Sequence, residues 1–295
     1  MKLTFRGNPG EQDMNASNIP ILDNHVHLDP FKGRHVDAVK DFEKLGGTHI
    51  IISHMPYEER PVKSIEDFRG SYDITIALKD KVNGETNVRA HATVGPYPGE
   101  LIRLEKIHGL QRAKEIMMEA LDLAADYVKD GKALAIGEVG RPHFPVSPDI
   151  WEASNEILSY AMRTAKETGC AIVLHTESTT PEIMKELADK ARKVGLDTDR
   201  VVKHYCAPFV LPEENHGLMP SVLASKDAID VALGKGLRFM METDFLDDPR
   251  RPGAVLNITT VPKRTNQLMQ KGVMRLDDAY QIHYDNPRRT YPGYL

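Results

Sequence analysis

A short apolar run precedes two closely spaced histidines in the stretch IPILDNHVHLD, residues 19–29. If Ile21 and Leu22 belong to a β-strand, successive side chains point to opposite faces, so His25 and His27 point the same way. Two imidazoles on one face at the end of a strand can chelate a single metal ion. Twelve histidines in 295 residues also produce some close pairs by chance, so a metal site requires further ligands from elsewhere in the chain.

Short β-branched or apolar runs alternate with helical segments along the rest of the chain. The predicted strands cover 19–25, 48–53, 88–94, 133–136, 170–174, 200–203, 221–225 and 237–241, and a mostly helical tail covers 261–291. This alternation predicts a parallel sheet, and eight units favour a closed (β/α)8 TIM barrel of the α/β class. An open doubly wound sheet is the alternative, although no glycine-rich dinucleotide fingerprint follows the first strand.

Length and composition are consistent with this fold. A chain of 295 residues suits one barrel domain, predicted over 19–295, with a polar N-terminal extension over 1–18. Apolar residues make up 41% and charged residues 27%, as is typical of a globular protein with a substantial core. The net charge of −5 argues against a surface that coats nucleic acid, but it allows a small basic substrate groove.

The N-terminal residues and the cysteines bear on the cellular compartment. Residues 1–15 contain no apolar segment of the signal-peptide kind, and no run approaches the ~18 apolar residues that span a bilayer. Cys170 and Cys206 are too few for a disulfide framework and are expected to be reduced thiols. We therefore expect a cytoplasmic protein without a membrane partner, and its composition is compatible with a homo-oligomer.

Metal-binding residue types recur where the predicted strands end. In a barrel, the carboxyl ends of the strands form the active-site face. The residues at these positions are His25, His27, Glu138, His175, His204 and Asp244. Core packing does not explain the set, because burying unpaired imidazoles and carboxylates is costly. Imidazole nitrogens and carboxylate oxygens are instead the donors that one or two divalent cations need.

Five short motifs carry a resemblance to a known family. In chain order they are Asp23-Asn24-His25-Val26-His27-Leu28, Gly137-Glu138-Val139-Gly140, Leu174-His175-Thr176, Lys203-His204-Tyr205-Cys206 and Glu242-Thr243-Asp244. Through these motifs the chain resembles the amidohydrolase superfamily, and within it the TatD-like metal-dependent hydrolases, over residues 19–291. A glutamate on the fourth strand points to the TatD-like branch, because the phosphotriesterase-like branch has a carboxylated lysine at that position.

The resemblance implies a dinuclear centre of two divalent metal ions. The two histidines of the first strand would bind one ion together with Asp244, His175 and His204 would bind the other, and Glu138 would bridge both. Asp244 would also act as the general base toward the attacking water, so that neither a covalent nucleophile nor an organic cofactor is needed. Zn²⁺ is the expected ion, with Mn²⁺, Mg²⁺, Ni²⁺ and Co²⁺ as alternatives.

Such a centre implies a hydrolase that acts through activated water. The resemblance favours phosphoester bonds, cleaved by a TatD-type phosphodiesterase or nuclease on a small-molecule or nucleic-acid substrate. An amide, lactone or carboxylic-ester hydrolase is the alternative, because metal-assisted hydrolysis alone does not choose between these bonds. A non-catalytic metal-binding barrel is the second alternative.

The sequence departs from the TatD nucleases after two of the ligands. Glu138 is followed by Arg141-Pro142-His143 in place of the family's Leu-Asp, and after His175 the chain lacks the arginine that usually comes there. Because an arginine would help to hold phosphate, Arg141, with His143 nearby, is a candidate for supplying the missing positive charge. An ion pair in a surface loop is the alternative role of Arg141.

Two further residues lie beside the predicted site. His54 follows the second strand and is a candidate for substrate binding, with a hydrogen-bonded structural role as the alternative. Lys203 is adjacent to His204, so strand alternation is expected to direct it to the opposite face, as a structural or exposed residue.

Overall fold

A computed structural model describes residues 19–294, so the predicted extension over 1–18 lies outside the described residues. All strand pairs are parallel and belong to one sheet, in the order β8-β7-β6-β5-β4-β3-β2-β1-β9. The strands are β1 Leu22–His27, β2 His49–Ser53, β3 Arg89–Val94, β4 Ala135–Gly140, β5 Ala171–His175, β6 Val201–Cys206, β7 Met219–Leu223, β8 Met240–Glu242 and β9 Phe245–Leu246.

The closure of this sheet comes from the shortest connection between two strands. Only Thr243 and Asp244 separate β8 from β9, so the two ends of the strand order meet within one stretch and the sheet curls into a barrel. The Thr243 backbone N–H and hydroxyl both donate to the Asp23 carboxylate on β1, which ties the closing stretch to the first strand. The predicted single-domain TIM-barrel fold is confirmed, and β9 is an addition to the eight strands expected from the sequence.

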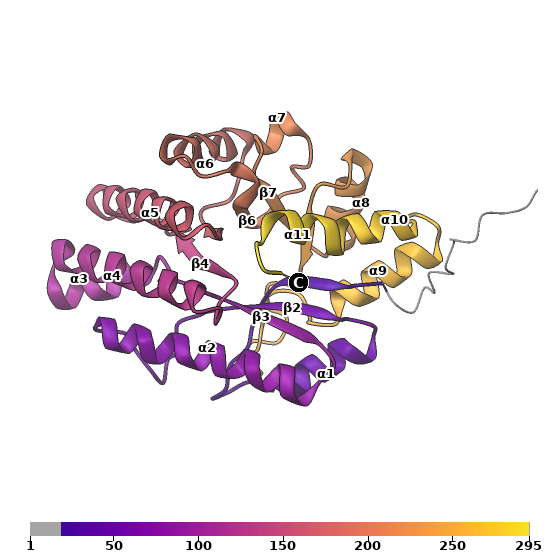
Figure 1. Ribbon diagram of the computed structural model, residues 1–295, viewed down its shortest axis with the longest axis horizontal. Coiled ribbons are helices and arrows are strands. Elements are labelled where there is room, and N and C mark those ends of the chain that lie inside the picture. Colours follow the sequence, from indigo (N-terminus) through magenta and orange to yellow (C-terminus); the bar gives the residue numbers. More distant parts are fainter. Residues whose placement is uncertain (1–18, 295) are drawn as a thin grey trace, which may run out of the picture.

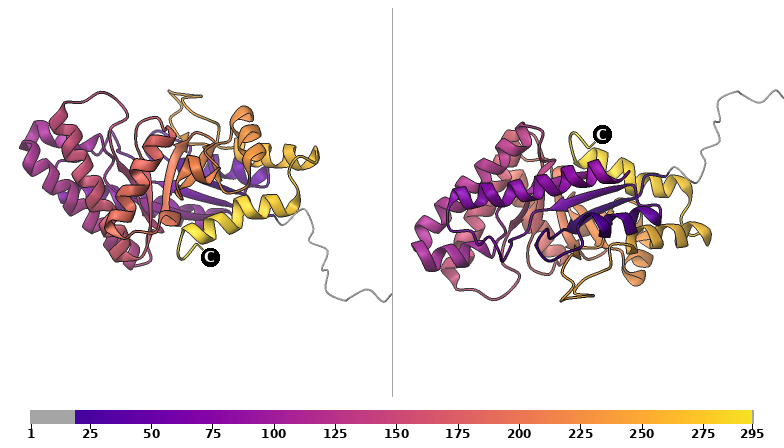
Figure 2. Two further views of the ribbon diagram at one scale, coloured as in Figure 1. Left: turned by 90° about the horizontal axis from the view of Figure 1, so that it is seen from above. Right: turned by 90° about the horizontal axis from the view of Figure 1, so that it is seen from below.

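Helices surround the sheet (Figures 1 and 2). They are α1 Val36–Lys44, α2 Ile65–Glu85, α3 Glu100–His108, α4 Leu110–Lys129, α5 Pro148–Thr168, α6 Pro181–Val194, α7 Pro212–Asn215, α8 Lys226–Lys235, α9 Thr260–Gln270, α10 Leu276–Tyr280 and α11 Asn286–Thr290. The N-terminus of α5 is capped by a side chain, because the Ser147 hydroxyl accepts from the Ile150 N–H and Pro148 occupies the first turn. Within residues 19–294, none of the helices combines the length and apolar character needed to cross a membrane.

The barrel interior is filled by one buried side-chain layer and closed at one end by the C-terminal segment. This layer comprises Leu22, Ile51, Leu134, Ala135, Ala171, Val173, Val202, Met219 and Met240, and Tyr291 and Tyr294 pack against it. Figures 1 and 2 show α11 lying across one end of the strands, which is the end where the strands begin. The predicted site lies at the opposite end, where the strands finish.

Candidate metal centre

The six predicted ligands converge at the carboxyl ends of the strands. They come from β1, β4, β5, β6 and the connection between β8 and β9. Their donor atoms form three overlapping groups, each within 4.8 Å: His25, His27 and Glu138; Glu138, His175 and His204; His25, His204 and Asp244. Parallel strands produce this convergence, because their carboxyl ends all open at the same edge of the barrel.

The first cluster of donors surrounds one oxygen of Glu138. The Nε2 atoms of His25 and His27 are 3.2 Å apart and lie 3.4 and 3.1 Å from Glu138 Oε1. Asp244 Oδ1 completes the cluster at 3.8 and 3.5 Å from the same two nitrogens. Two imidazoles and two carboxylates thus face a common point.

The second cluster of donors surrounds the other oxygen of the same carboxylate. Glu138 Oε2 lies 2.5 Å from His175 Nδ1 and 3.4 Å from His204 Nε2. The two imidazole nitrogens are themselves 3.2 Å apart. Glu138 therefore stands between the clusters and offers one oxygen to each.

The spacing of these donors fits a cation. Ligands at ~2.1 Å from a tetrahedral ion lie roughly 3.4 Å from one another, close to the spacing of most pairs in both clusters. The electrostatics agree, because burial lowers the pKa of His27 but the hydrogen bonds that its ring donates to Asp244 and Glu138 raise it to about 10. The two carboxylates thus create a field that holds positive charge at this position. The residues present therefore fit a divalent metal ion.

Ser53, at the end of β2, orients both histidines of β1. Its hydroxyl lies 3.0 Å from His25 Nδ1, and its backbone carbonyl lies 3.0 Å from His27 Nδ1. Each ring is thereby fixed with its Nε2 toward the first cluster. Metal-binding histidines commonly have such a hydrogen-bond partner on the ring nitrogen that faces away from the metal. Sequence reasoning missed Ser53, since a serine at a strand end carries no signal of its own.

The other two histidines also have a partner on the far ring nitrogen. His204 Nδ1 lies 3.2 Å from Glu242 Oε1, and His175 Nε2 lies 2.8 Å from Nδ1 of the exposed His143. Glu242 lies in the last of the five sequence motifs, and the motif alone assigns it no role. Its position two residues before Asp244 is a signal that could have found it, because alternate strand residues share a face.

Burial and ion pairing set the protonation of the acidic groups. Burial raises the pKa of Glu138, but His175 and His204 hold it well below the usual range. Burial likewise raises the pKa of Asp244, while the His27 hydrogen bond and nearby histidines lower it overall. Both carboxylates are therefore ionised near neutral pH and can act as anionic ligands.

A model of the family described as TatD related DNase matches residues 22–292. The chain belongs to the TatD-related DNase family. The uncharacterized protein MJ1127 of Methanocaldococcus jannaschii is 43% identical over 275 residues, which cover 92% of this chain and 96% of the relative. Family membership and the His/Glu clusters together indicate a metal-dependent hydrolase.

Solved structures share the fold of this TatD-family chain. An organophosphorus hydrolase from Deinococcus radiodurans superposes with a TM-score of 0.62 at 14% identity, covering 94% of this chain and 93% of that one. The TatD-like protein from Archaeoglobus fulgidus superposes with a TM-score of 0.59 at 14% identity, covering 91% and 99%. At these identities the likeness supports the barrel architecture alone.

A pocket of about 340 Å³ opens over the second cluster of the TatD-family site. Its lining comprises His143, His175, Thr176, Glu177, Ser178, Lys203, His204, Tyr205, Asp244, Ala254 and Val255. The volume is at the small end of the range for small-molecule sites. The pocket thus reaches three of the predicted ligands and His143.

Lys203 lies in this pocket, contrary to the expectation from strand alternation. It is 1% exposed and lines the same cavity as its neighbour His204. The reason is an irregularity in β6, whose pairing register with β7 shifts between Lys203 and Cys206. Tyr205, within this irregular part, has a positive φ of 50°. Two consecutive side chains can therefore reach one cavity, which a regular strand would not allow.

Arg141 is buried beside the pocket instead of projecting into it. Its guanidinium is 1% exposed, donates to both carboxylate oxygens of Glu177, and lies 2.7 Å from Glu186 Oε1. It also donates to Asn155 Oδ1 at 3.1 Å and lies over the Trp151 ring at 4.8 Å. This geometry favours a role in fixing Glu177 over direct contact with a substrate.

The structure does not bring His54 to the pocket. The side chain is 2% exposed and is turned toward α2, where Nδ1 lies 3.0 Å from the Thr75 hydroxyl. Its Nε2 faces the Ser71 hydroxyl at 3.5 Å, and its ring packs edge-on against Tyr72. Burial lowers the pKa of His54 to about 3. The geometry therefore favours the structural role that was its alternative.

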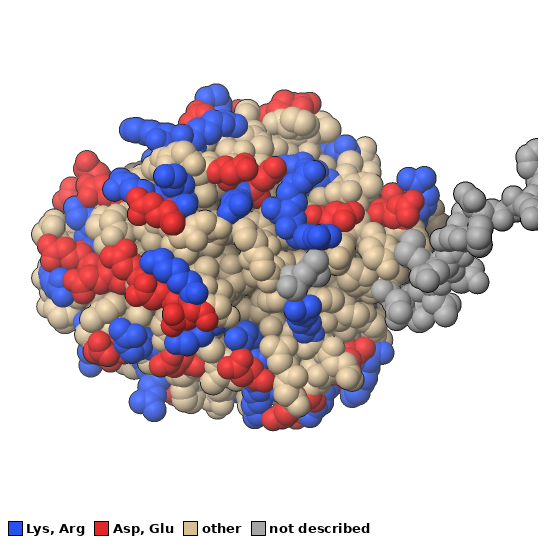
Figure 3. All heavy atoms as spheres, in the orientation of Figure 1, with Lys and Arg blue, Asp and Glu red and all other residues tan. Residues whose placement is uncertain are grey.

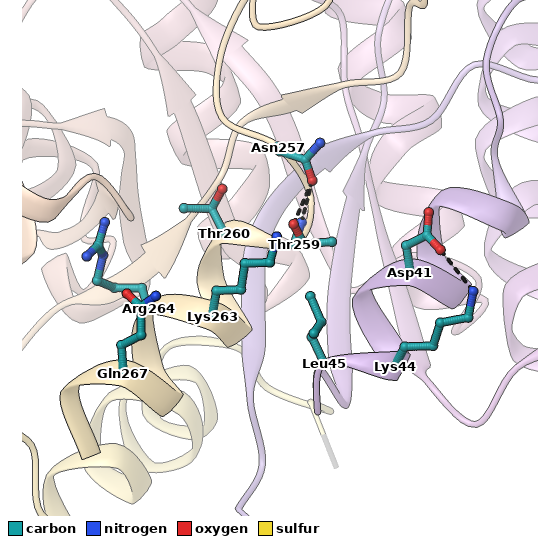
Figure 4. Close-up of a pocket in the computed structure, with 9 residues that line it drawn as sticks. All are labelled: Asp41, Lys44, Leu45, Asn257, Thr259, Thr260, Lys263, Arg264 and Gln267. Atoms are coloured by element: carbon teal, nitrogen blue, oxygen red, sulfur yellow. Dashed lines mark hydrogen bonds and ion pairs between the residues drawn. The ribbon is translucent and has the colours of Figure 1, made fainter. Parts of the chain in front are cut away.

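Two surface features lie outside the site. A hollow of about 710 Å³ lies between α1 and α9 and shares no lining residue with the site pocket (Figure 4). Its wall carries the ion pair of Lys44 with Asp41 and the side chain of Lys263.

On the face drawn in Figure 3, basic and acidic side chains of the described residues are interspersed without a continuous positive band. This agrees with the negative net charge.

Proposed function

We propose that this protein is a phosphoester hydrolase with a dinuclear divalent-metal centre, a phosphodiesterase or nuclease of TatD type. The observation that carries the proposal is the position of Glu138 between two histidine pairs, with one oxygen toward each. A carboxylate shared in this way suits two adjacent cations, and two-cation sites are common in phosphoester hydrolysis.

We infer the ligands of each ion from the two donor clusters. In the first site, Asp244 would join the two β1 histidines, and in the second, His175 and His204 would act together, with Glu138 shared. Bound divalent cations would supply Lewis acidity toward the substrate oxygens and lower the pKa of water. The histidine-rich donor set favours Zn²⁺, while Mn²⁺, Mg²⁺, Ni²⁺ and Co²⁺ also accept such ligands.

The protein's own groups have separate tasks in this proposal. Asp244 belongs to both the first cluster and the pocket lining, so its ionised carboxylate can accept the proton of the attacking water at Oδ1 or Oδ2. Ser53 and Glu242 hold the histidine rings in a fixed orientation. The pocket volume of about 340 Å³ suits a small phosphoester or the end of a nucleic-acid strand.

The proposed compartment is the cytoplasm. Cys170 and Cys206 are both buried and free, which is compatible with thiols that stay reduced.

A hydrolysis screen of protein reconstituted with Zn²⁺, and separately with Mn²⁺, tests the proposed activity. Substrates are bis-p-nitrophenyl phosphate, single-stranded DNA, a panel of lactones and N-acyl amino acids. We expect metal-dependent turnover of the phosphoesters that is abolished by chelation. Robust lactone or amide turnover with no phosphoester turnover would instead support the carboxylic-ester and amide alternative. Metal binding without turnover of any substrate would support the non-catalytic barrel.

A further inference from the structure

The Lys203 side chain is a buried basic group that the proposed chemistry does not use. It is 1% exposed, and its ammonium donates to the backbone carbonyl of His204. Within residues 19–294, no carboxylate lies within the 4.0 Å that defines an ion pair with this ammonium. An ammonium has three N–H donors, so this one hydrogen bond leaves donor capacity unused.

A buried lysine without a carboxylate partner is costly. Lysines are almost never fully buried unless they are paired, because removing the charge from water is penalised. Arg141, which is also buried beside the pocket, has such partners in Glu177 and Glu186. Lys203, in contrast, has no carboxylate partner among the described residues. An anion from outside the chain would supply one.

The position of Lys203 shows where that anion would come from. Lys203 lines the pocket together with His204 and Asp244, and it is the one lysine or arginine among the pocket-lining residues that the structure describes. A group bound over the second cluster would therefore share this pocket with Lys203. To pair with the lysine, this bound group would have to carry a negative charge.

We propose that the Lys203 ammonium binds an ionised non-bridging oxygen of the substrate and makes the site selective for anionic phosphoesters over neutral esters. This inference rests on the proposed phosphoester hydrolysis. It assigns to Lys203 the positive charge that is missing after His175. A hydrogen bond between charged groups in a site with little water is strong, so its loss should be measurable.

The test compares two substrates that share one leaving group. Metal-loaded wild type, Lys203→Met and Lys203→Gln are assayed on anionic bis-p-nitrophenyl phosphate and on neutral diethyl p-nitrophenyl phosphate. We expect kcat/KM for the anionic diester to fall roughly 10- to 100-fold, while the neutral triester changes less than about threefold. The ratio of the two rates is unaffected if a fraction of a variant is misfolded. An equal loss on both substrates, or no loss on either, would overturn the inference.

A binding measurement separates this inference from the proposed function. Calorimetry gives the affinity of metal-loaded protein for inorganic phosphate, which requires no turnover. We expect the Kd to rise roughly 10- to 100-fold in Lys203→Met and to be unchanged in Lys226→Met, whose lysine pairs with Asp230 on the exposed face of α8. Metal content is measured for each variant. Equal phosphate affinity in wild type and Lys203→Met, or no phosphate binding by wild type, would overturn the inference even if phosphoesters are hydrolysed.

Discussion

Both ends of this barrel contain histidines, but their surroundings differ. At the mouth, the histidines at the carboxyl ends of β1, β5 and β6 face Glu138 and Asp244. At the floor, which is the end where the strands begin, His283 has a hydroxyl and backbone groups as partners. Its Nε2 lies 2.9 Å from Thr265 Oγ1, and its Nδ1 lies 3.2 Å from the Leu22 backbone nitrogen. His91, also at the floor, packs near Tyr294, and its Nε2 has no hydrogen-bond partner among the described residues.

The difference shows that carboxylates, and not histidines alone, create a cation site. Burial lowers the pKa of His283 to about 4 and that of His91 to about 4, so both are neutral at pH 7. At the mouth, Asp244 and Glu138 outweigh burial and raise the pKa of His27 to about 10. The two floor histidines are therefore neutral packing groups, whereas His27 lies in a field that favours positive charge.

A chain of buried polar contacts runs between the two ends. Glu242 contacts His204 on one side and accepts from the Ser221 hydroxyl on the other. Asn24 donates to Ser221 Oγ at 3.0 Å and accepts from the Tyr291 hydroxyl at 3.1 Å. Hydrogen bonds through the interior thus connect the floor with the mouth. Substitutions at successive positions along these contacts can therefore test how the two ends differ.

The largest expected effect is at the mouth. Asp244→Asn removes the proposed proton acceptor, and we expect turnover to fall 10²- to 10⁴-fold, far more than bound metal falls. Steady-state kinetics and metal analysis measure the two quantities. The matched control is His91→Gln, which changes a floor histidine outside the site. This variant should keep wild-type turnover and metal content. Wild-type turnover in Asp244→Asn would show that another group is the base.

The second prediction concerns acid stability at the floor. Because the pKa of His283 in the folded protein is lowered to about 4, its contribution to stability is present above pH 6.5 and is lost as the pH falls toward 4. The loss amounts to roughly 3 kcal/mol for a shift of this size. Denaturant unfolding of metal-free protein at pH 7 and 4.5 measures it. His283→Gln should have a flatter pH dependence than wild type, and identical slopes would contradict the prediction.

A smaller effect is expected one step behind the metal ligands. Glu242→Gln replaces the carboxyl group that contacts His204 Nδ1, and we expect the metal affinity to fall roughly 10- to 100-fold. Competition with a chelating dye measures the affinity. Glu100→Gln is the matched control, since Glu100 is equally buried but pairs with Arg103 on α3. If both variants lose affinity equally, the effect is on folding and not on orientation of the ring.

The smallest effect is expected at the floor end of the polar chain. Tyr291→Phe removes the hydroxyl that donates to Asn24 while keeping the ring in the interior layer. We expect the free energy of unfolding to fall by about 1 kcal/mol and turnover to change less than about twofold. Denaturant unfolding and steady-state kinetics measure these values. A loss of turnover comparable to that of Glu242→Gln would show that the floor controls the mouth.

Much of the site followed from the sequence because it depends on backbone direction. Alternating strands and helices predict parallel strands, and parallel strands bring residues that are far apart, such as His25 and His204, to one edge. The spacing of His25 and His27 follows from the two-residue period of a strand. These features need no knowledge of packing, so the barrel and the meeting of the six predicted ligands were predictable.

Other features were decided only by tertiary structure. The irregular pairing of β6 turns Lys203 into the pocket, although strand period predicted the opposite face. Arg141 and His54 follow the predicted strands as expected, but Glu177 and Thr75 draw their polar groups away from the pocket. Long and polar side chains choose among partners that the fold brings close, and those partners come from distant parts of the chain. The sequence by itself determined which residues end the strands, whereas packing and backbone irregularity determined which of their neighbours face the substrate pocket.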